Sequence, residues 1–153
     1  MSDHPYDERF LLEAIELSRS APPSQAAFSV GCVIAGADDR ILATGYSRER
    51  GPQSHAEAVA IEKALEERAI LAGSTLYTSL EPCSIRRSGL LTCSVRILEA
   101  GIPRVVFAMR EPALFVEGHG AEVLALGGVD VVECSRYARL VTEINAHLIG
   151  NTR

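Results

Sequence analysis

The sequence predicts an α/β fold, namely a three-layer α/β/α sandwich with a five-stranded mixed sheet. From residue 55 onward, segments with helical periodicity alternate with short apolar runs. Two earlier apolar runs flank residues 36–40, whose composition is that of a hairpin loop. The 153 residues are 47% hydrophobic, which suffices for one full core. We therefore expect a single domain over residues 1–153.

The N-terminal part of the chain is expected to form one helix and one strand pair. Apolar residues between Phe10 and Leu17 recur on one helical face, and this helix must end before Pro22. The next apolar runs, 30–35 and 41–45, are predicted as strands. Because a short loop joins these strands, we expect them to pair in antiparallel fashion.

The rest of the chain is expected to form crossover units. Helices are predicted at residues 55–68, 93–100, 121–126 and 136–147, and strands at 75–78, 105–108 and 129–132. A helix between successive strands favours parallel pairing and a sheet that is covered by helices on both faces. This alternation is the main reason to expect three layers.

Four side chains supply the groups of a catalytic zinc site. His55, Cys83 and Cys93 are of the types that zinc prefers, and three ligands leave tetrahedral zinc one open position for a water. Glu57 stands two residues after His55, so its carboxylate can lie beside the metal without binding it. We therefore predict Zn²⁺ as the cofactor, the imidazole and the two thiols as its ligands, and Glu57 as the catalytic proton carrier.

The spacing of these residues partly matches a catalytic signature. Zinc-dependent nucleobase deaminases carry His-x-Glu followed by Pro-Cys-x-x-Cys, with the Glu as general acid and base. The runs 55–57 and 82–83 fit this pattern, but the second cysteine stands much later, at Cys93. The intervening residues must loop out and return, so that Cys93 begins a helix whose N-terminus favours a thiolate.

On these residues the chain resembles a known family. The runs His-Ala-Glu (55–57), Leu-Glu-Pro-Cys-Ser (80–84) and Ala-Gly-Ile-Pro-Arg-Val-Val (100–106) resemble the deaminase domain of riboflavin-pathway diaminohydroxyphosphoribosylaminopyrimidine deaminases, within the cytidine and deoxycytidylate deaminase superfamily. The similarity continues to Asn145. It implies a cytidine-deaminase-like fold, the zinc ligation and the role of Glu57 given above, and a homodimer or homotetramer whose neighbouring subunit helps to close the pocket.

Two segments depart from the family pattern. Members usually carry Asn-Pro-x-Val-Gly before the first strand, where the Asn contacts the base, whereas residues 27–31 read Ala-Phe-Ser-Val-Gly. Between the cysteines, Ile85 stands where the family has a His, and the loop holds an extra residue. We therefore expect the riboflavin-pathway phosphoribosyl intermediate to be a poorer substrate than some other amino-heterocycle.

Substrate contacts are expected from the segment before the first strand, the loop between the cysteines and a glycine-flanked turn. The candidate residues are Phe28, Ser29, Ala56, Ser84, Arg86, Arg87 and His119. Arginine binds phosphate or carboxylate through paired N–H donors, so at least one of Arg86 and Arg87 is expected to bind an anionic group. The alternative for this pair is a solvated loop or a subunit contact.

Several other residues have structural interpretations. Glu81 either fixes the loop of Cys83 or is a surface charge. Cys32 and Cys134 are expected to be small buried apolar residues, and His147 is expected at the surface. Because the chain holds four cysteines and no secretory signal, these cysteines are interpreted as metal-binding or buried thiols rather than disulfides.

Charge and hydropathy narrow the range of partners. The net charge of −5 argues against a nucleic-acid polymer, because such partners need clustered Lys and Arg. No run approaches the ~18 apolar residues of a membrane helix. We expect a cytoplasmic protein that acts on a small molecule and has no membrane contact.

The function expected from these observations is zinc-dependent hydrolytic deamination. An amino-substituted heterocycle, such as a pyrimidine-type base, nucleoside or nucleotide, would become its carbonyl form with release of ammonia. One alternative is a deaminase of a cytosine nucleoside or nucleotide, a purine base or a specialised metabolite. An alternative of another class is a non-catalytic scaffold stabilised by zinc, in which Glu57 would be incidental.

Overall fold

The computed structural model describes residues 8–84, 91–112 and 119–149. In chain order its helices and strands are α1 (Glu8–Leu17), β1 (Gly31–Ala35), β2 (Ile41–Tyr46), α2 (Ala56–Glu66), β3 (Thr75–Leu80), α3 (Cys93–Ala100), β4 (Arg104–Met109), α4 (Gly120–Leu126), β5 (Asp130–Glu133), α5 (Ala138–Ile144) and α6 (Ala146–Ile149). Two short 3-10 helices, η1 (Ser18–Ser20) and η2 (Ser135–Tyr137), follow α1 and β5. The predicted order of helices and strands is confirmed.

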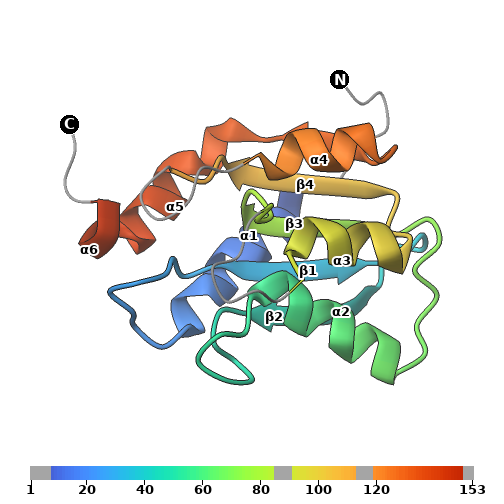
Figure 1. Ribbon diagram of the computed structural model, residues 1–153, viewed down its shortest axis with the longest axis horizontal. Coiled ribbons are helices and arrows are strands. Elements are labelled where there is room, and N and C mark those ends of the chain that lie inside the picture. Colours follow the sequence, from blue (N-terminus) through green and yellow to red (C-terminus); the bar gives the residue numbers. More distant parts are fainter. Residues whose placement is uncertain (1–7, 85–90, 113–118, 150–153) are drawn as a thin grey trace.

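The five strands form one mixed sheet in the order β2-β1-β3-β4-β5 (Figure 1). β1 pairs antiparallel with both β2 and β3, while β3, β4 and β5 pair in parallel. The hairpin and the parallel crossovers expected from the sequence are therefore both present. Since β2 and β3 both pair antiparallel with β1, they run in the same direction without being neighbours. α2 connects them along the chain.

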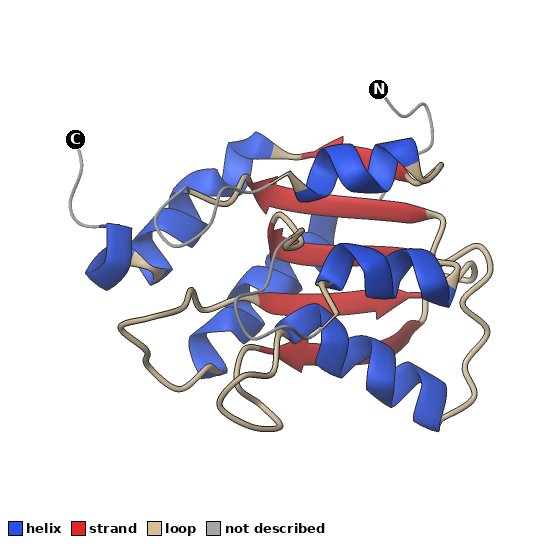
Figure 2. Ribbon diagram, viewed as in Figure 1, coloured by secondary structure: helices blue, strands red, loops and turns tan. Residues whose placement is uncertain are grey.

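Helices cover both faces of the sheet, which gives the expected three layers. α1 lies behind the strands, and α2, α3 and α4 lie in front of them (Figures 1 and 2). Two glycines allow the helices to approach closely. A Cβ atom at Gly31 would collide with the carbonyl oxygen of Ala14 in α1, and one at Gly45 would collide with the carbonyl oxygen of Ala56 in α2.

Successive residues of β3 show which side chains belong to which layer. The ring of Tyr77 packs against Phe10 of α1, with 5.4 Å between the ring centroids. The next residue, Thr78, points the other way and hydrogen-bonds to Glu57 of α2. This alternation is the normal consequence of strand pleating. It places the candidate zinc residues on the α2 face of the sheet.

The prediction of one continuous helix at the end of the chain was wrong. Residues 136–147 were expected to form one helix, but the chain forms η2, α5 and α6, with a break at Asn145. The buried Asn145 side chain accepts the N–H of Ser29 through Oδ1 (2.7 Å) and donates from Nδ2 to the Ser29 carbonyl (3.2 Å). The break thus coincides with a contact between segments that are far apart in the sequence.

In the part of the chain that the structure describes, every helix is too short or too polar to cross a bilayer.

Candidate active site

Three elements bring the predicted zinc ligands together. His55 immediately precedes α2, Cys83 follows the end of β3, and Cys93 begins α3. Nδ1 of His55 lies 3.5 Å from Sγ of Cys83 and 3.4 Å from Sγ of Cys93. Among the described residues, these three form the one group of at least three His, Cys, Asp or Glu side chains that could hold a metal ion, with all ligand atoms within 4.8 Å of one another.

The separations between these atoms fit zinc. With Zn–S of about 2.3 Å, Zn–N of about 2.0 Å and tetrahedral angles, nitrogen and sulfur ligands should lie about 3.6 Å apart. The two measured N···S distances of 3.5 and 3.4 Å are close to this value. One imidazole and two thiols are also a donor set that zinc prefers, and they leave a fourth position for a small ligand.

Local hydrogen bonds favour the metal-binding form of the Cys83 thiol. The pKa of the Cys83 thiol is lowered to about 4, chiefly by its hydrogen bond with Cys93, although burial opposes this change. His55 and the backbone N–H of Cys93 lower it further, the latter through a 3.2 Å hydrogen bond to Sγ. Thr92 caps α3 by accepting the N–H of Val95 (3.2 Å), which fixes the helix N-terminus at Cys93. The lowered pKa favours the thiolate of Cys83, which is the form that binds metal.

Glu57 lies beside this group but is not one of the three ligands. It stands in the first turn of α2 and its side chain is 4% exposed. Burial raises the pKa of the Glu57 carboxyl, and the Cys83 thiolate adds to this effect, while His55 and a hydrogen bond from Thr78 oppose it. Cys32, which is completely buried, is held as a neutral thiol because burial and the charge of Glu57 raise its pKa.

Glu81 is a buried structural residue, so the interpretation as a surface charge was wrong. Its carboxylate is 2% exposed and accepts the backbone N–H groups of Glu111 (3.1 Å) and Ala121 (2.9 Å). It also lies 3.6 Å from the guanidinium of Arg110. Glu81 therefore ties the segment after β4 and the start of α4 to the strand end that carries Cys83.

The start of α4 also contacts the ligand loop directly. The backbone N–H of His119 donates to Oγ of Ser84 (3.1 Å), and the His119 side chain is exposed. These two predicted substrate contacts are thus brought together, next to Cys83. Ala56, a third predicted contact, is fully buried between His55 and Glu57.

Phe28 and Ser29 are both buried, and the polar groups of Ser29 are engaged within the protein. Asn145 binds the Ser29 backbone, and Oγ of Ser29 accepts a hydrogen bond from Arg48 (3.3 Å). Arg48 also donates to the carbonyl oxygens of Phe28 (3.3 Å) and Pro22 (2.7 Å). This segment is firmly anchored, and its contact with substrate stays a prediction.

Arg86, Arg87 and Ile85 lie outside the described residues. The anionic-group role of the two arginines therefore stays a prediction. The same holds for the expected effect of Ile85 on substrate choice.

Two residues near the site were not found from the sequence. Thr78 bonds directly to Glu57, and Glu111 follows β4 at the edge where the parallel strands end. Burial raises the pKa of the Glu111 carboxyl to about 7, and the negative charges of Cys83, Glu57 and Glu81 add to this. The carboxyl ends of parallel strands meet at one edge of a sheet, so the position of Glu111 after a predicted strand was a usable signal.

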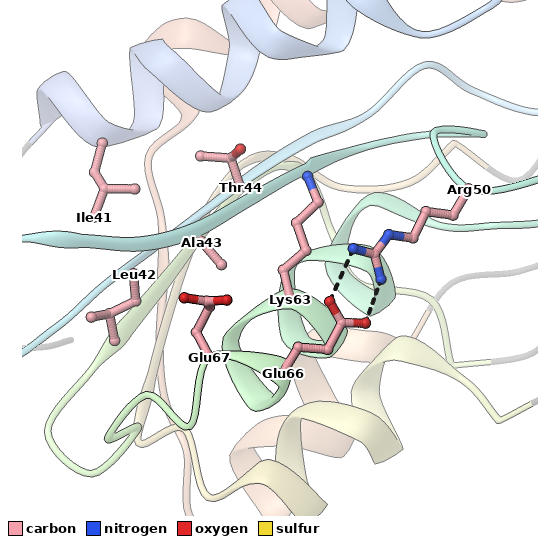
Figure 3. A pocket seen from close by; sticks show the side chains of 8 residues that line it. All are labelled: Ile41, Leu42, Ala43, Thr44, Arg50, Lys63, Glu66 and Glu67. Atoms are coloured by element: carbon pink, nitrogen blue, oxygen red, sulfur yellow. Dashed lines mark hydrogen bonds and ion pairs between the residues drawn. The ribbon is translucent and has the colours of Figure 1, made fainter.

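A separate groove of about 420 Å³ lies between the edge strand β2 and α2 (Figure 3). Its lining residues are Ile41, Leu42, Ala43, Thr44, Arg50, Lys63, Glu66 and Glu67. Its two cations are paired within the protein, Arg50 with Glu66 (2.8 Å) and Lys63 with Glu49. It includes none of the zinc ligands, so it is distinct from the candidate active site.

Comparison with known proteins supports the interpretation of these residues as a zinc site. Residues 5–109 match the model of the cytidine and deoxycytidylate deaminase zinc-binding region. The chain is 37% identical over 132 residues to a diaminohydroxyphosphoribosylamino-pyrimidine deaminase of Schizosaccharomyces pombe, which covers 84% of this chain and 32% of the relative. It spans about one third of the length of the curated relatives that it matches.

Solved structures give the same result. A bifunctional deaminase and 5-amino-6-(5-phosphoribosylamino)uracil reductase from Thermotoga maritima has a TM-score of 0.78 and 33% identity, covering 93% of this chain and 40% of that chain. The Rib2 deaminase of Aspergillus oryzae in complex with DARIPP has a TM-score of 0.78 and 25% identity, covering 92% of this chain and 90% of that chain. The ligand geometry, the fold and these similarities together lead to one assignment: the chain belongs to the cytidine and deoxycytidylate deaminase family of zinc-binding enzymes.

Proposed function

We propose that this chain catalyses the zinc-dependent hydrolytic deamination of an amino-substituted, pyrimidine-type heterocycle. The observation that carries the proposal is the buried carboxylate of Glu57. It lies beside the metal triad of His55, Cys83 and Cys93 without belonging to it. A site that only stabilised the fold would normally have a fourth protein ligand on the zinc. It would have no need of a buried ionisable group that does not bind the metal. Such groups are costly in a core and cluster at functional sites.

The reaction replaces an exocyclic amine by a carbonyl. Water supplies the oxygen, the carbon–nitrogen bond to the amine breaks, and ammonia leaves. When bound by His55, Cys83 and Cys93, zinc would lower the pKa of a water from 15.7 towards ~7 and so supply a nucleophile at neutral pH.

Glu57 moves the protons in this proposal. Its carboxylate accepts a proton from the attacking water and delivers it to the ring nitrogen next to the amino-bearing carbon. It then takes the remaining proton of the former water, by now a hydroxyl on that carbon, and gives it to the exocyclic amine, so that the carbonyl forms and ammonia leaves. Burial raises the pKa of the Glu57 carboxyl above its ordinary value, which favours uptake of the proton from water.

The substrate class is supported by the relatives, and the exact substrate is left open between two expectations. The similarity to diaminohydroxyphosphoribosylamino-pyrimidine deaminases favours an aminopyrimidine that carries a ribose phosphate. The departures at Ala27 and Ile85 favour another amino-heterocycle, such as a cytosine nucleoside or nucleotide, a purine base or a specialised metabolite. Arg86 and Arg87 are proposed to bind an anionic group if the substrate carries one.

We further propose that the chain forms a homodimer or homotetramer in the cytoplasm. The basis for the assembly is the expectation that a neighbouring subunit helps to close the pocket. Its test is the mass of the zinc-loaded protein in solution.

The function is tested by ammonia release from a panel of compounds. The zinc-loaded protein is incubated with aminopyrimidines, including the riboflavin-pathway intermediate, and with cytosine nucleosides and nucleotides and purines. We expect release from at least one aminopyrimidine-type compound and none from the Glu57→Gln variant. Release that persists in this variant would overturn the role of Glu57. A preference for a purine would move the protein to the alternative substrate class.

A further inference from the structure

We propose that Thr78 is a positioning residue for the reaction, because its hydroxyl fixes the carboxylate of Glu57 in the orientation needed for proton transfer. The proposal rests on the proposed function, in which Glu57 carries the protons. Thr78 itself touches neither metal ligand nor substrate in this role.

The contact is direct and buried. Oγ1 of Thr78 donates to Oε2 of Glu57 over 3.0 Å, and the Thr78 side chain is 0% exposed. Thr78 lies opposite Cys32 in the β1–β3 register, so both side chains face α2. Water is therefore a poor competitor for this hydrogen bond, which is worth more in such surroundings than at a surface.

One oxygen of the carboxylate is thus assigned to the protein. With Oε2 held by Thr78, the other oxygen, Oε1, is the one that exchanges protons with water and substrate. A β-branched side chain has few rotamers, so Thr78 keeps its hydroxyl in place with little entropic cost. Misplacement of a catalytic group by about 1 Å can cost roughly 100-fold in rate, so this constraint has a measurable effect.

The same hydroxyl has a second acceptor within reach, at the end of β3. Oγ1 of Thr78 lies 3.1 Å from the carbonyl oxygen of Leu80, just before the segment that carries Cys83. A hydroxyl has a single proton and donates to one acceptor at a time. The two hydrogen bonds are therefore alternatives, and the proposal concerns the one to Glu57.

The neighbouring residue provides a matched control. Ser79 is also 0% exposed, and its hydroxyl accepts a hydrogen bond from the Gly31 N–H (3.1 Å). By strand alternation its side chain lies on the opposite face from Thr78. A purely structural need for buried hydroxyl groups in β3 would affect both positions alike.

The test compares Thr78→Val, Thr78→Ser, Ser79→Ala and Glu57→Gln in the zinc-loaded chain of 153 residues, with the best substrate of the panel. We expect Thr78→Val to keep its zinc and a KM within about twofold, and to lose roughly 10- to 100-fold in kcat. Thr78→Ser should recover most of this loss, because it restores the hydroxyl. Ser79→Ala should keep kcat near that of the unaltered protein.

Two results would overturn the role of Thr78. They are a kcat of Thr78→Val within about twofold of the unaltered protein, and an equal loss in Thr78→Ser, which would point to the methyl group instead of the hydroxyl. Ammonia release from none of the panel compounds by the unaltered protein would instead overturn the proposed function.

A second readout does not depend on turnover. The carboxylate stretching band of Glu57 is isolated by infrared difference against Glu57→Gln. We expect this band to shift in Thr78→Ala or Thr78→Val and to stay in place in Thr78→Ser and Ser79→Ala. An unshifted band in both hydroxyl-free variants would show that the hydrogen bond is absent and would overturn the proposal.

Discussion

The central sheet buries different chemistry on its two faces. Under α1, the rings of Phe10 and Tyr77 pack together in an apolar layer. Under α2, Cys32 and Thr78 stand in register beside the buried carboxylate of Glu57. Both faces belong to the same strands, since alternate residues of β1 and β3 point in opposite directions.

The difference between the α1 face and the α2 face indicates which residues stabilise the fold and which serve the site. Apolar burial on the α1 face stabilises the fold without further conditions. On the α2 face each buried polar group needs a partner, because an unpaired one costs free energy comparable to a lost hydrogen bond. We therefore expect substitutions on the α1 face to change the free energy of unfolding, and substitutions on the α2 face to change metal binding and turnover.

The largest effect is expected when a thiol ligand is removed. Cys83→Ala and Cys93→Ala should each lose most of the zinc, all measurable turnover and part of the thermal stability, because two ligands hold zinc weakly. Elemental analysis and thermal unfolding measure this. Cys134→Ala is the matched control, since Cys134 is also buried but lies outside the triad. Full zinc occupancy in both ligand variants would contradict the assignment.

The next largest effect is expected at the proton carrier. Glu57→Gln should keep about one zinc ion per chain and the fold, and lose at least ~10²–10⁴-fold in kcat, because an amide cannot carry protons. Ammonia release and metal content are measured on the same sample. The exposed Glu99, changed to Gln, serves as control and should behave normally. Near-normal turnover of Glu57→Gln would mean that another group does this work.

A substitution on the α1 face should have the opposite signature. Leu11 is 0% exposed, so Leu11→Ala should lower the free energy of unfolding by about 2–5 kcal/mol, while zinc content and kcat of the folded fraction stay nearly unchanged. Urea unfolding measures the first quantity. Leu65, which is 57% exposed on α2, is the matched control and should cost less than about 0.5 kcal/mol as Ala. Loss of zinc in Leu11→Ala would show that the two faces are not separable.

The smallest effect is expected from the pH dependence of Glu111 in the metal-free protein. Its pKa is raised from 4.5 to about 7, so the folded state binds this proton more tightly than the unfolded state. The stability contributed by Glu111 is therefore fully present below pH 4.5 and is lost as the pH rises through 7. Glu111→Gln lacks this loss, so its stability relative to the unaltered protein should rise over that window. Equal pH slopes in urea unfolding would contradict the prediction.

Much of the fold and the metal triad could be predicted from local patterns. Periodicity located the helices, the loop at 36–40 indicated the hairpin, and the residue types at His55, Cys83 and Cys93 indicated the metal group. These features depend on residues that are close in sequence or on side-chain chemistry alone. The same holds for the start of α3 at Cys93.

The rest depends on contacts between distant segments. An apolar run does not show which strands it pairs with, so the place of β1 between β2 and β3 was not predicted. The break at Asn145 coincides with its hydrogen bond to Ser29, 116 residues earlier. The bond of Thr78 to Glu57 likewise requires knowledge of which face of β3 meets α2. The pKa of Glu111 depends on burial, which the sequence alone does not give.

The close approach of α2 to Gly45 limits which residues this position can hold. The space that its missing side chain leaves is filled by the carbonyl of Ala56, which stands between His55 and Glu57, the proposed proton carrier. Gly45→Ala would push the start of α2 outward, so kcat measured beside Tm should fall by a larger proportion. We therefore expect this position on an edge strand to act as a spacer for the start of α2, so that a larger residue there would affect catalysis as well as packing.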